Sequence, residues 1–386
     1  MVARLLYPRL LRAPDTSFFL LGIRGAGKST WVRETLPGTL RLDLLNASLY
    51  HDLLREPTTF AGLLEGLPPR SWVIVDEVQR IPGLLHEVHR FIEERRLRFA
   101  LLGSSARRLR SGGTNLLAGR ALSMTLHPLV PSELGDDLDL QRMMRLGSIP
   151  LVWQAADAVA TLEAYVQLYL EQEIRAEALV RNLPGFARFL PVAALFHGQT
   201  INVASIARDA GTARSTVNGY LELLEDTLLV HRLQAYQARV RVRERKLPKL
   251  YWADPGLVRA AKRQLGPVSV EEAGPLFEGI VLTMLRVHGQ QTRLYEDLAF
   301  WSPHQSSVEV DFLLRRGREF LALEAKAATR FSRSQLQGLL AIADLPGVVR
   351  RILVYNGERI LRTPEGIEVW PLRALSDALA LDRLWP

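Results

Sequence analysis

Short apolar runs alternate with polar and helical segments along the first third of the chain. The runs are Phe18–Leu21, Thr39–Leu45, Trp72–Glu77 and Arg98–Ser105, and the last two end in polar residues. Continuously apolar runs of this length are typical of parallel strands that are buried on both faces. A helix is expected at Ser29–Leu36, after the first run. The alternation therefore predicts an α/β domain built on a parallel sheet.

Helical periodicity dominates the middle of the chain. Glu163–Val180 is amphipathic, and Ile201–Gly211 followed by Thr212–Glu225 has the pattern helix, glycine-containing turn, helix. This pattern is typical of a helix-turn-helix. Leu228–Val230 and a basic stretch follow as the wing of a winged helix would; the basic residues are Arg239, Arg241, Arg243, Arg245 and Lys246.

The predicted helix-turn-helix has two interpretations. If the module binds duplex DNA, the start of its second helix faces the major groove, and the residues there are Arg214, Ser215 and Thr216. Winged helices also serve as protein–protein modules and as lids of ATPase domains. The pattern alone leaves both interpretations open.

The first apolar run leads directly into a phosphate-binding motif. Gly22–Ser29 matches G-x-x-x-x-G-K-[ST], the P-loop, whose glycines let backbone N–H groups turn toward phosphate oxygens. The helix that follows directs its positive dipole end at the same oxygens. Lys28 would supply charge to the β- and γ-phosphates of ATP, and Ser29 a hydroxyl ligand for Mg²⁺. The residues expected to bind ATP are Gly22, Arg24, Gly25, Ala26, Gly27, Lys28, Ser29 and Thr30.

Two adjacent acids end the third apolar run, which is the Walker B arrangement. Asp76 would hold Mg²⁺, directly or through water, and Glu77 would polarise the attacking water. Paired carboxylates after a strand are also common as helix caps. The P-loop upstream favours the catalytic interpretation.

Composition narrows the class of protein. The chain has 386 residues, of which 48% are hydrophobic and 23% charged, as in soluble globular proteins. No apolar run approaches the roughly 20 residues that a membrane span needs, and the N-terminus has no signal-peptide pattern. Because there are no cysteines, disulfides and thiolate metal sites are excluded. We expect a cytoplasmic protein with no membrane partner.

The net charge is +8, and the sequence pI is near 10.0. A basic chain favours polyanionic partners, with nucleic acid first among them. The alternative is coding bias, because only five basic residues are lysine, namely residues 28, 246, 249, 262 and 326, and the other 44 are arginine. Against this lysine-poor background, Lys28 and Lys326 both lie within chemical motifs.

Four segments together resemble one family. Gly22–Thr30, Val75–Arg80, Gly103–Arg107 and Leu117–Ala121 are similar to the prokaryotic AAA+ ATPases whose C-terminal half was long known only as a domain of unknown function. The resemblance continues to the end of the chain. It implies a P-loop AAA+ domain at 1–150, a helical and winged-helix domain at 151–246, and an α/β restriction-endonuclease-like domain at 247–386.

The resemblance also implies roles for polar residues outside the P-loop. Ser104 or Ser105 would sense the γ-phosphate, although a serine here also suits the N-cap of a following helix. Arg120 would reach the γ-phosphate of a neighbouring subunit, although a structural salt bridge is the competing interpretation. An arginine supplied in this way requires a homo-oligomer, and a hexameric ring is one form.

The C-terminal half carries a second group of chemical residues. Val308–Leu314 and Phe320–Lys326 are expected to be two strands joined near Gly317, which would place Asp311 opposite Leu323 and Glu324. Asp311, Glu324 and Lys326 resemble the PD-(D/E)xK core, with Val310 in place of proline. The resemblance implies that Asp311 and Glu324 bind Mg²⁺ and that Lys326 orients the water. Glu278, on a preceding helix, would be an accessory acid. A surface salt-bridge pattern is the alternative.

Together these patterns predict an ATP-hydrolysing AAA+ protein, with ATP and Mg²⁺ as cofactors. It would bind duplex or branched DNA and couple nucleotide turnover to DNA engagement or remodelling. One alternative is a nucleotide-controlled switch that binds DNA or a protein partner and has an inert nuclease fold. Another is an ATP-gated, Mg²⁺-dependent nuclease. A signalling ATPase that uses the winged helix to bind proteins would bind DNA only weakly.

Overall fold

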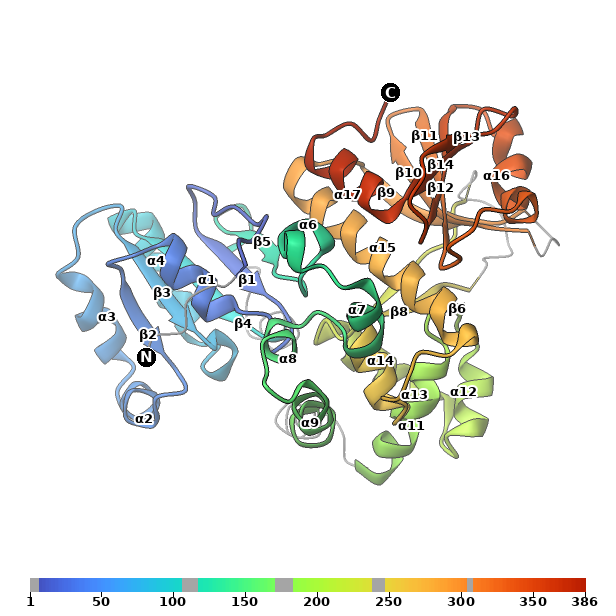
Figure 1. The fold of residues 1–386 in the computed structure, drawn as a ribbon. Helices are drawn as coiled ribbons and strands as arrows, with labels where there is room; N and C mark the ends of the chain where they lie inside the picture. Colours follow the sequence, from blue (N-terminus) through green and yellow to red (C-terminus); the bar gives the residue numbers. More distant parts are fainter. Residues whose placement is uncertain (1–6, 106–116, 171–182, 238–246, 304–307) are drawn as a thin grey trace. The chain divides into compact units, whose positions relative to one another are not determined.

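The chain forms two compact units. The first comprises residues 1–127 with 226–229, and the second comprises residues 128–225 with 230–386. The structure, a computed structural model (Figure 1), describes residues 7–105, 117–170, 183–237, 247–303 and 308–386. Within these ranges, no helix is both long enough and apolar enough to cross a bilayer. The domain boundaries at 150 and 246 stay a prediction.

The first unit is built on a five-stranded sheet in the order β2-β3-β4-β1-β5, and all neighbouring strands are parallel. The predicted α/β class of this region is confirmed. Its strands are β1 (Phe18–Leu21), β2 (Leu40–Asp43), β3 (Trp72–Asp76), β4 (Arg98–Gly103) and β5 (Leu122–Thr125). Because all strands run the same way, their carboxyl ends lie along one edge of the sheet, where α/β folds place their ligands.

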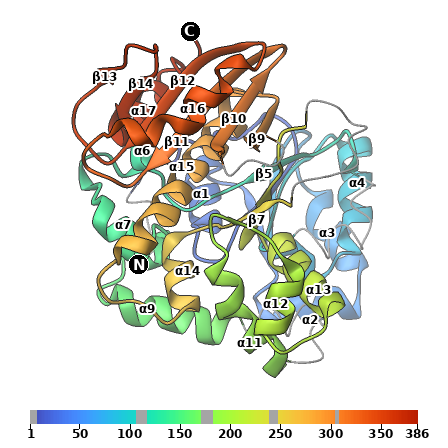
Figure 2. The same cartoon turned by 90° about the vertical axis from the view of Figure 1, so that its right-hand side faces the viewer.

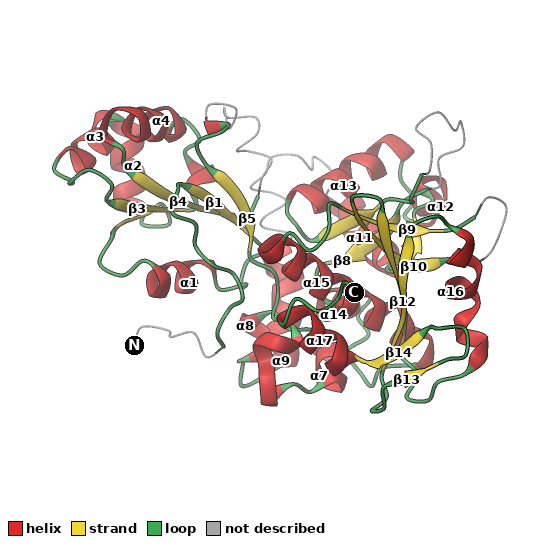
Figure 3. Cartoon of the chain, turned by 90° about the horizontal axis from the view of Figure 1, so that it is seen from above, coloured by secondary structure: helices red, strands yellow, loops and turns green. Residues whose placement is uncertain are grey.

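Helices cover both faces of this sheet (Figure 3), which explains why β1 and most of β3 and β4 are apolar and buried. Phe18 and Leu20 pack in one apolar cluster with Trp31 and Val32 of α1. Phe19, the residue between them, points to the opposite cluster, which α2, α3 and α4 supply. The helices are α1 (Lys28–Thr35), α2 (Ala47–Arg55), α3 (Thr58–Glu65) and α4 (Leu84–Arg95).

The second unit contains a six-stranded mixed sheet in the order β13-β14-β12-β11-β10-β9. The strands are β9 (Asp297–Trp301), β10 (Val310–Arg316), β11 (Glu319–Lys326), β12 (Val348–Tyr355), β13 (Leu361–Arg362) and β14 (Glu368–Pro371). The hairpin that joins β10 and β11 turns at Gly317, as the sequence predicts, and pairs Phe312 with Leu323. Helices pack against this sheet, namely α15 (Val270–Thr292), α16 (Gln337–Ala341) and α17 (Leu372–Ala380).

The same unit contains the predicted helix-turn-helix, whose backbone is confirmed (Figure 2). Its two helices are α12 (Val203–Asp209) and α13 (Arg214–Asp226), joined by a turn at Gly211. A small antiparallel sheet accompanies them, in the order β6 (Gln199–Thr200), β8 (Lys249–Trp252) and β7 (Val230–Leu233). The basic stretch expected as a wing, residues 239–246, lies outside the described residues.

The second unit contains further helices. They are α6 (Pro131–Leu134), α7 (Leu140–Leu146), α8 (Pro150–Trp153), α9 (Ala158–Ala164), α11 (Leu183–Leu195) and α14 (Pro255–Ala261). The helix expected at Glu163–Val180 starts as α9 and continues as a π-helix over Tyr165–Leu170. Its remainder lies outside the described residues.

Candidate functional site

The P-loop lies between β1 and α1, at the carboxyl edge of the five-stranded sheet. Gly22 comes directly after β1 and lies against the chain that follows β5. A Cβ atom on residue 22 would lie 2.5 Å from the carbonyl oxygen of Leu126. Gly27 is the N-cap of α1 and has a φ of 91°, in the left-handed region that favours glycine. Both positions therefore require glycine, and the backbone N–H groups at the start of α1 are placed for an anion.

Lys28 is buried at the first position of α1. Its Nζ donates to the carbonyl oxygens of Gly22, at 2.7 Å, and Ile23, at 3.3 Å. These acceptors are neutral main-chain groups from its own loop. A phosphate oxygen would be a stronger partner for the ammonium, because its negative charge adds Coulomb attraction to the hydrogen bond. In the same loop, Arg24 is exposed and Ser29 and Thr30 are half-buried.

Asp76 and Glu77 lie at the end of β3, on the same edge of the sheet. Asp76 is buried, and its Oδ2 accepts a charged hydrogen bond of 2.6 Å from Arg41 of β2. Glu77 has a φ of 59°, which turns the chain sharply after the strand. Ser29 and Asp76 offer the oxygen ligands that Mg²⁺ prefers, so the residues present fit the ion. Sequence reasoning missed Arg41, because only the register of β2 against β3 reveals it.

Gln79 links Glu77 to Ser104. Its Nε2 donates to Glu77 Oε2 at 2.5 Å and to Ser104 Oγ at 3.2 Å. Gln79 is buried, as are Ser104 and Ser105 at the end of β4. The carboxylate expected to polarise water and the hydroxyl expected to sense the γ-phosphate therefore share one amide. Sequence reasoning missed Gln79, although its place two residues after Glu77 was a signal.

Arg120 lies at the opposite edge of the sheet from the P-loop of its own chain. It precedes β5, whose Leu122 pairs with Phe18 at the start of β1, whereas the P-loop follows the end of β1. Its Nε forms an ion pair with Glu93 of α4. The structure thus contains the salt bridge that was the competing interpretation. A role toward a neighbouring subunit stays a prediction.

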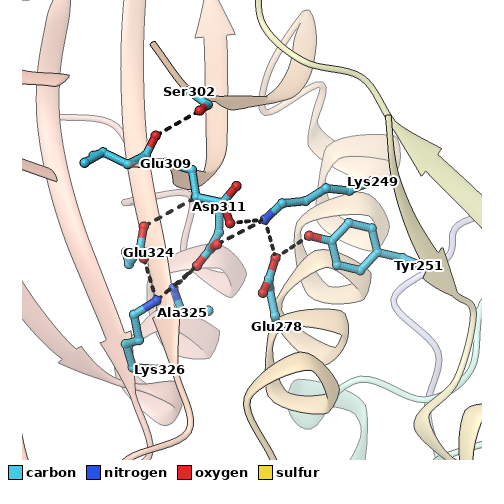
Figure 4. Close-up of polar contacts among 10 residues, drawn as sticks. Lys249, Tyr251, Glu278, Ser302, Glu309, Asp311, Glu324, Ala325 and Lys326 are labelled. Atoms are coloured by element: carbon cyan, nitrogen blue, oxygen red, sulfur yellow. Dashed lines mark hydrogen bonds and ion pairs between the residues drawn. The ribbon is translucent and has the colours of Figure 1, made fainter. Parts of the chain in front are cut away.

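The predicted C-terminal residues converge on β10, β11 and α15 (Figure 4). The pairing of Phe312 with Leu323 places Asp311 opposite Glu324, and both carboxylates are buried. Lys326 Nζ lies 2.5 Å from Glu324 Oε1 and 3.8 Å from Asp311 Oδ2. The group is therefore buried rather than spread over the surface. We call Glu278, Glu309, Asp311 and Glu324 the carboxylate cluster.

Two residues of β8 enter this cluster, and sequence reasoning assigned no role to either of them (Figure 4). Lys249 is 2% exposed, and its Nζ lies 2.9 Å from Glu309, 3.1 Å from Glu278 and 3.4 Å from Asp311. Tyr251 donates a hydrogen bond from its hydroxyl group to Glu278 Oε1. The signal for Lys249 was its residue type, since the chain has only five lysines.

Burial and charge shift the protonation equilibria of the cluster. Burial, followed by the charge of Asp311, raises the pKa of Glu278 to about 7 and that of Glu324 to about 8. For Lys249, burial lowers the pKa, but the carboxylates of Glu278, Asp311 and Glu309 outweigh it and raise the pKa. The lysine is therefore an ammonium across the physiological range of pH.

The first turn of α13 is accessible to solvent. Arg214 and Ser215 are exposed and Thr216 is half-buried, whereas Val217 and Tyr220 are buried. Tyr220 packs against Phe186 and Phe189 of α11, with ring centroids 5.1 Å apart in each pair. The aromatic packing fixes the helix and leaves its first turn accessible.

Three family models match successive parts of the chain. Residues 15–135 match an AAA domain, residues 137–267 match a domain of unknown function (DUF8612), and residues 273–375 match another (DUF4143). The first unit thus carries an AAA domain, as the sequence predicts, and an AAA domain implies nucleotide binding. No activity is attached to the other two models.

Similar proteins span nearly the whole chain. An uncharacterised protein of Mycobacterium tuberculosis is 28% identical over 97% of this chain and 84% of its own length. An uncharacterised protein of Haemophilus influenzae is 23% identical over 94% of each chain. The similarity to these proteins therefore extends beyond the AAA domain to the C-terminal half of the chain.

Solved structures are similar at a greater distance. The ORC2 protein of Aeropyrum pernix in its ADP form has a TM-score of 0.33 and 15% identity, over 65% of this chain and 87% of that one. The ORC1 protein of the same organism, in complex with DNA, has a TM-score of 0.25 and 14% identity, over 64% and 86%. Likeness at this level assigns no function to the present chain.

Proposed function

We propose that this protein hydrolyses ATP and couples nucleotide turnover to the engagement or remodelling of DNA. One observation carries the proposal. Lys28, Asp76, Glu77 and Ser104 come from the ends of two strands, β3 and β4, and from the start of α1, and all lie along the carboxyl edge of one parallel sheet. The matching AAA domain covers all four residues.

Each side chain has a distinct task in this proposal. Lys28 exchanges the carbonyl oxygens of Gly22 and Ile23 for oxygens of the β- and γ-phosphates. Ser29 and Asp76 would hold Mg²⁺, which neutralises the charge that develops on the phosphates. Glu77 accepts a hydrogen bond from the attacking water and so polarises it. Gln79 holds the Glu77 carboxylate beside Ser104.

DNA binding rests on the helix-turn-helix and on charge. The exposed first turn of α13 would face the major groove with Arg214 and Ser215. A net charge of +8 favours a polyanion over a neutral protein partner. Phosphate contacts release counterions, so the affinity for DNA must fall steeply as salt is raised. A salt-independent interaction would favour a protein partner instead.

Oligomerisation is proposed from the place of Arg120. Because this arginine lies at the opposite edge of its own sheet from the P-loop, it can serve a γ-phosphate only in another subunit. We expect Arg120→Ala to lose hydrolysis and to recover part of it when mixed with Glu77→Gln subunits, which supply the arginine. Unchanged turnover in Arg120→Ala alone would leave only the salt bridge with Glu93.

The proposed function is tested by ATP hydrolysis with and without duplex, single-stranded and branched DNA. Lys28→Ala serves as the blank. Stimulation by one form of DNA supports a DNA-coupled ATPase and identifies its substrate. Turnover that is unchanged by all three forms of DNA would show that ATP hydrolysis is not coupled to DNA.

A nucleotide-controlled regulatory switch is the second candidate, and one observation favours it. The carboxylate cluster already holds two lysine ammonium groups, Lys249 and Lys326, within its own unit. Under this candidate, ATP binding changes the affinity for DNA or a partner, and the C-terminal domain cleaves nothing. DNA affinity that depends on bound nucleotide, with turnover independent of DNA, would support it.

A further inference from the structure

The ammonium group of Lys249 lies among carboxylates from two different elements and the segment between β9 and β10. Glu278 comes from α15, Asp311 from β10, and Glu309 from the residues just before β10. Oxygen atoms gathered in this way from several elements are the surroundings that a divalent cation takes in proteins. Here a lysine nitrogen takes that place (Figure 4).

The oxygens of Asp311 and Glu324 already accept other hydrogen bonds. Asp311 Oδ2 accepts from the backbone N–H of Ala325 at 2.9 Å, and Glu324 Oε2 from the N–H of Asp311 at 3.4 Å. Glu324 Oε1 accepts from Lys326. Among the residues that the structure describes, no group of three or more His, Cys, Asp or Glu side chains is placed to hold a metal ion. As arranged, the residues therefore do not fit Mg²⁺.

Lys249 is held in this place by its strand. β8 is the central strand of the three-stranded sheet and pairs with both β6 and β7. Residues 249 and 251 share one face of the strand, so Lys249 and Tyr251 reach Glu278 together. The ammonium also lies 5.5 Å from the ring centre of Phe300. Its withdrawal would require β8 to separate from α15 and β10.

We propose that Lys249 stands permanently in the position of a divalent cation. The carboxylate cluster is then a metal-free ion network that fastens the three-stranded sheet to α15 and the six-stranded sheet. The C-terminal domain accordingly performs no metal-assisted hydrolysis of nucleic acid. This proposal does not depend on ATP hydrolysis and holds whether or not the first unit is an active ATPase.

The test measures Mn²⁺ binding to the full chain by electron paramagnetic resonance, in the absence of nucleotide. All samples carry Asp76→Asn, which removes the carboxylate expected to hold the ion in the first unit. We expect the parent and the Asp311→Asn variant to bind Mn²⁺ equally. We expect Lys249→Met to bind Mn²⁺ at least about tenfold more tightly, because its carboxylates lose their counter-charge.

Two controls make the result specific. Lys262→Met removes another paired lysine, whose Nζ lies 2.6 Å from Glu272 outside the cluster, and should gain no Mn²⁺ affinity. The double variant Lys249→Met with Asp311→Asn should lose the gain. A folded Lys249→Met protein that binds no extra Mn²⁺ would overturn the proposal.

The parent protein keeps the test decisive if Lys249→Met does not fold. Mn²⁺ binding in the parent that disappears in Asp311→Asn would show a metal at the cluster and would overturn the proposal. Nicking of DNA by the parent that requires Mg²⁺ and is lost in Asp311→Asn would overturn it as well. Equal Mn²⁺ binding by the two proteins supports it.

Discussion

Two buried lysines, Lys28 and Lys249, donate hydrogen bonds to groups of different charge. Lys28 donates to neutral carbonyl oxygens five and six residues away in its own loop. Lys249 lies among three carboxylates, of which Glu278 and Asp311 are 29 and 62 residues away. Carbonyl groups release an ammonium to a phosphate readily, whereas buried carboxylates do not, because separation leaves uncompensated charges.

The comparison shows that residue type and burial do not by themselves identify a working lysine. What decides is the charge of its partners in the absence of ligand. A lysine with neutral partners still attracts an incoming anion, whereas the charge of a lysine with anionic partners is already neutralised by them. The carbonyl bonds of Lys28 can be exchanged for bonds to phosphate oxygens, whereas the ion pairs of Lys249 close the carboxylate cluster to a cation.

The largest expected effect is on nucleotide turnover. Lys28→Ala should lower ATP hydrolysis on the order of 100-fold or more, because it removes a positive charge that the proposed transition state requires. Its unfolding by urea should change less than its turnover, since the hydrogen bonds to the carbonyl oxygens of Gly22 and Ile23 are made to neutral groups. Lys262→Ala is the matched control. Normal turnover in Lys28→Ala would place hydrolysis elsewhere.

The next effect is on stability. Lys249→Met, studied in EDTA, should lower the free energy of unfolding of the second unit by about 3–5 kcal/mol, because it leaves buried carboxylates without their partner. Urea unfolding followed by tryptophan fluorescence measures the loss. Addition of Mn²⁺ should restore part of it. A loss no larger than that in Lys262→Met would remove the contrast between the two lysines.

A smaller effect is expected at Gln79. Gln79→Ala should lower kcat about 10- to 100-fold while KM changes little, because the Glu77 carboxylate loses its hydrogen bond and its orientation. Binding of a fluorescent ATP analogue checks that the P-loop is intact. Glu77→Ala on the Gln79→Ala background should add almost no further loss. A raised KM with kcat unchanged would assign Gln79 to nucleotide binding instead.

The smallest effect concerns pH. Burial raises the pKa of Glu324 in the folded protein from 4.5 to about 8, so the folded state favours the protonated acid. Its contribution to stability is complete below pH 4.5 and is lost as the pH rises through about 8. The free energy of unfolding should therefore fall less between about pH 5 and pH 8 in Glu324→Gln than in the parent.

Parallel urea titrations at three pH values in this range measure the difference. Glu278 contributes a change of the same sign in both proteins, because burial also raises its pKa, to about 7. Identical slopes would mean that Glu324 ionises normally in the folded state. Glu368→Gln is a suitable control, since the Arg350 guanidinium lowers the pKa of that acid.

The sequence predicted those features whose causes lie close together along the chain. The P-loop follows from a strand, two obligatory glycines and a helix start within a dozen residues. The hairpin of β10 and β11 follows from two runs of strand length that are joined near Gly317, and their pairing brings Asp311 opposite Glu324. The position of Asp76 and Glu77 at the end of a buried strand was likewise predicted from neighbouring residues alone.

Only the tertiary structure revealed the partners that decide what these motifs can do. Arg41 meets Asp76 through the register of two strands, and Gln79 meets Ser104 across 25 residues. Lys249 reaches its carboxylates because β8 lies beside α15 and β10. The physical reason is that local sequence sets backbone conformation, whereas the charge surrounding a buried group depends on chain segments brought together by packing. The sequence by itself determined the chemical groups and their strands, and the fold decided which lysine keeps its charge available.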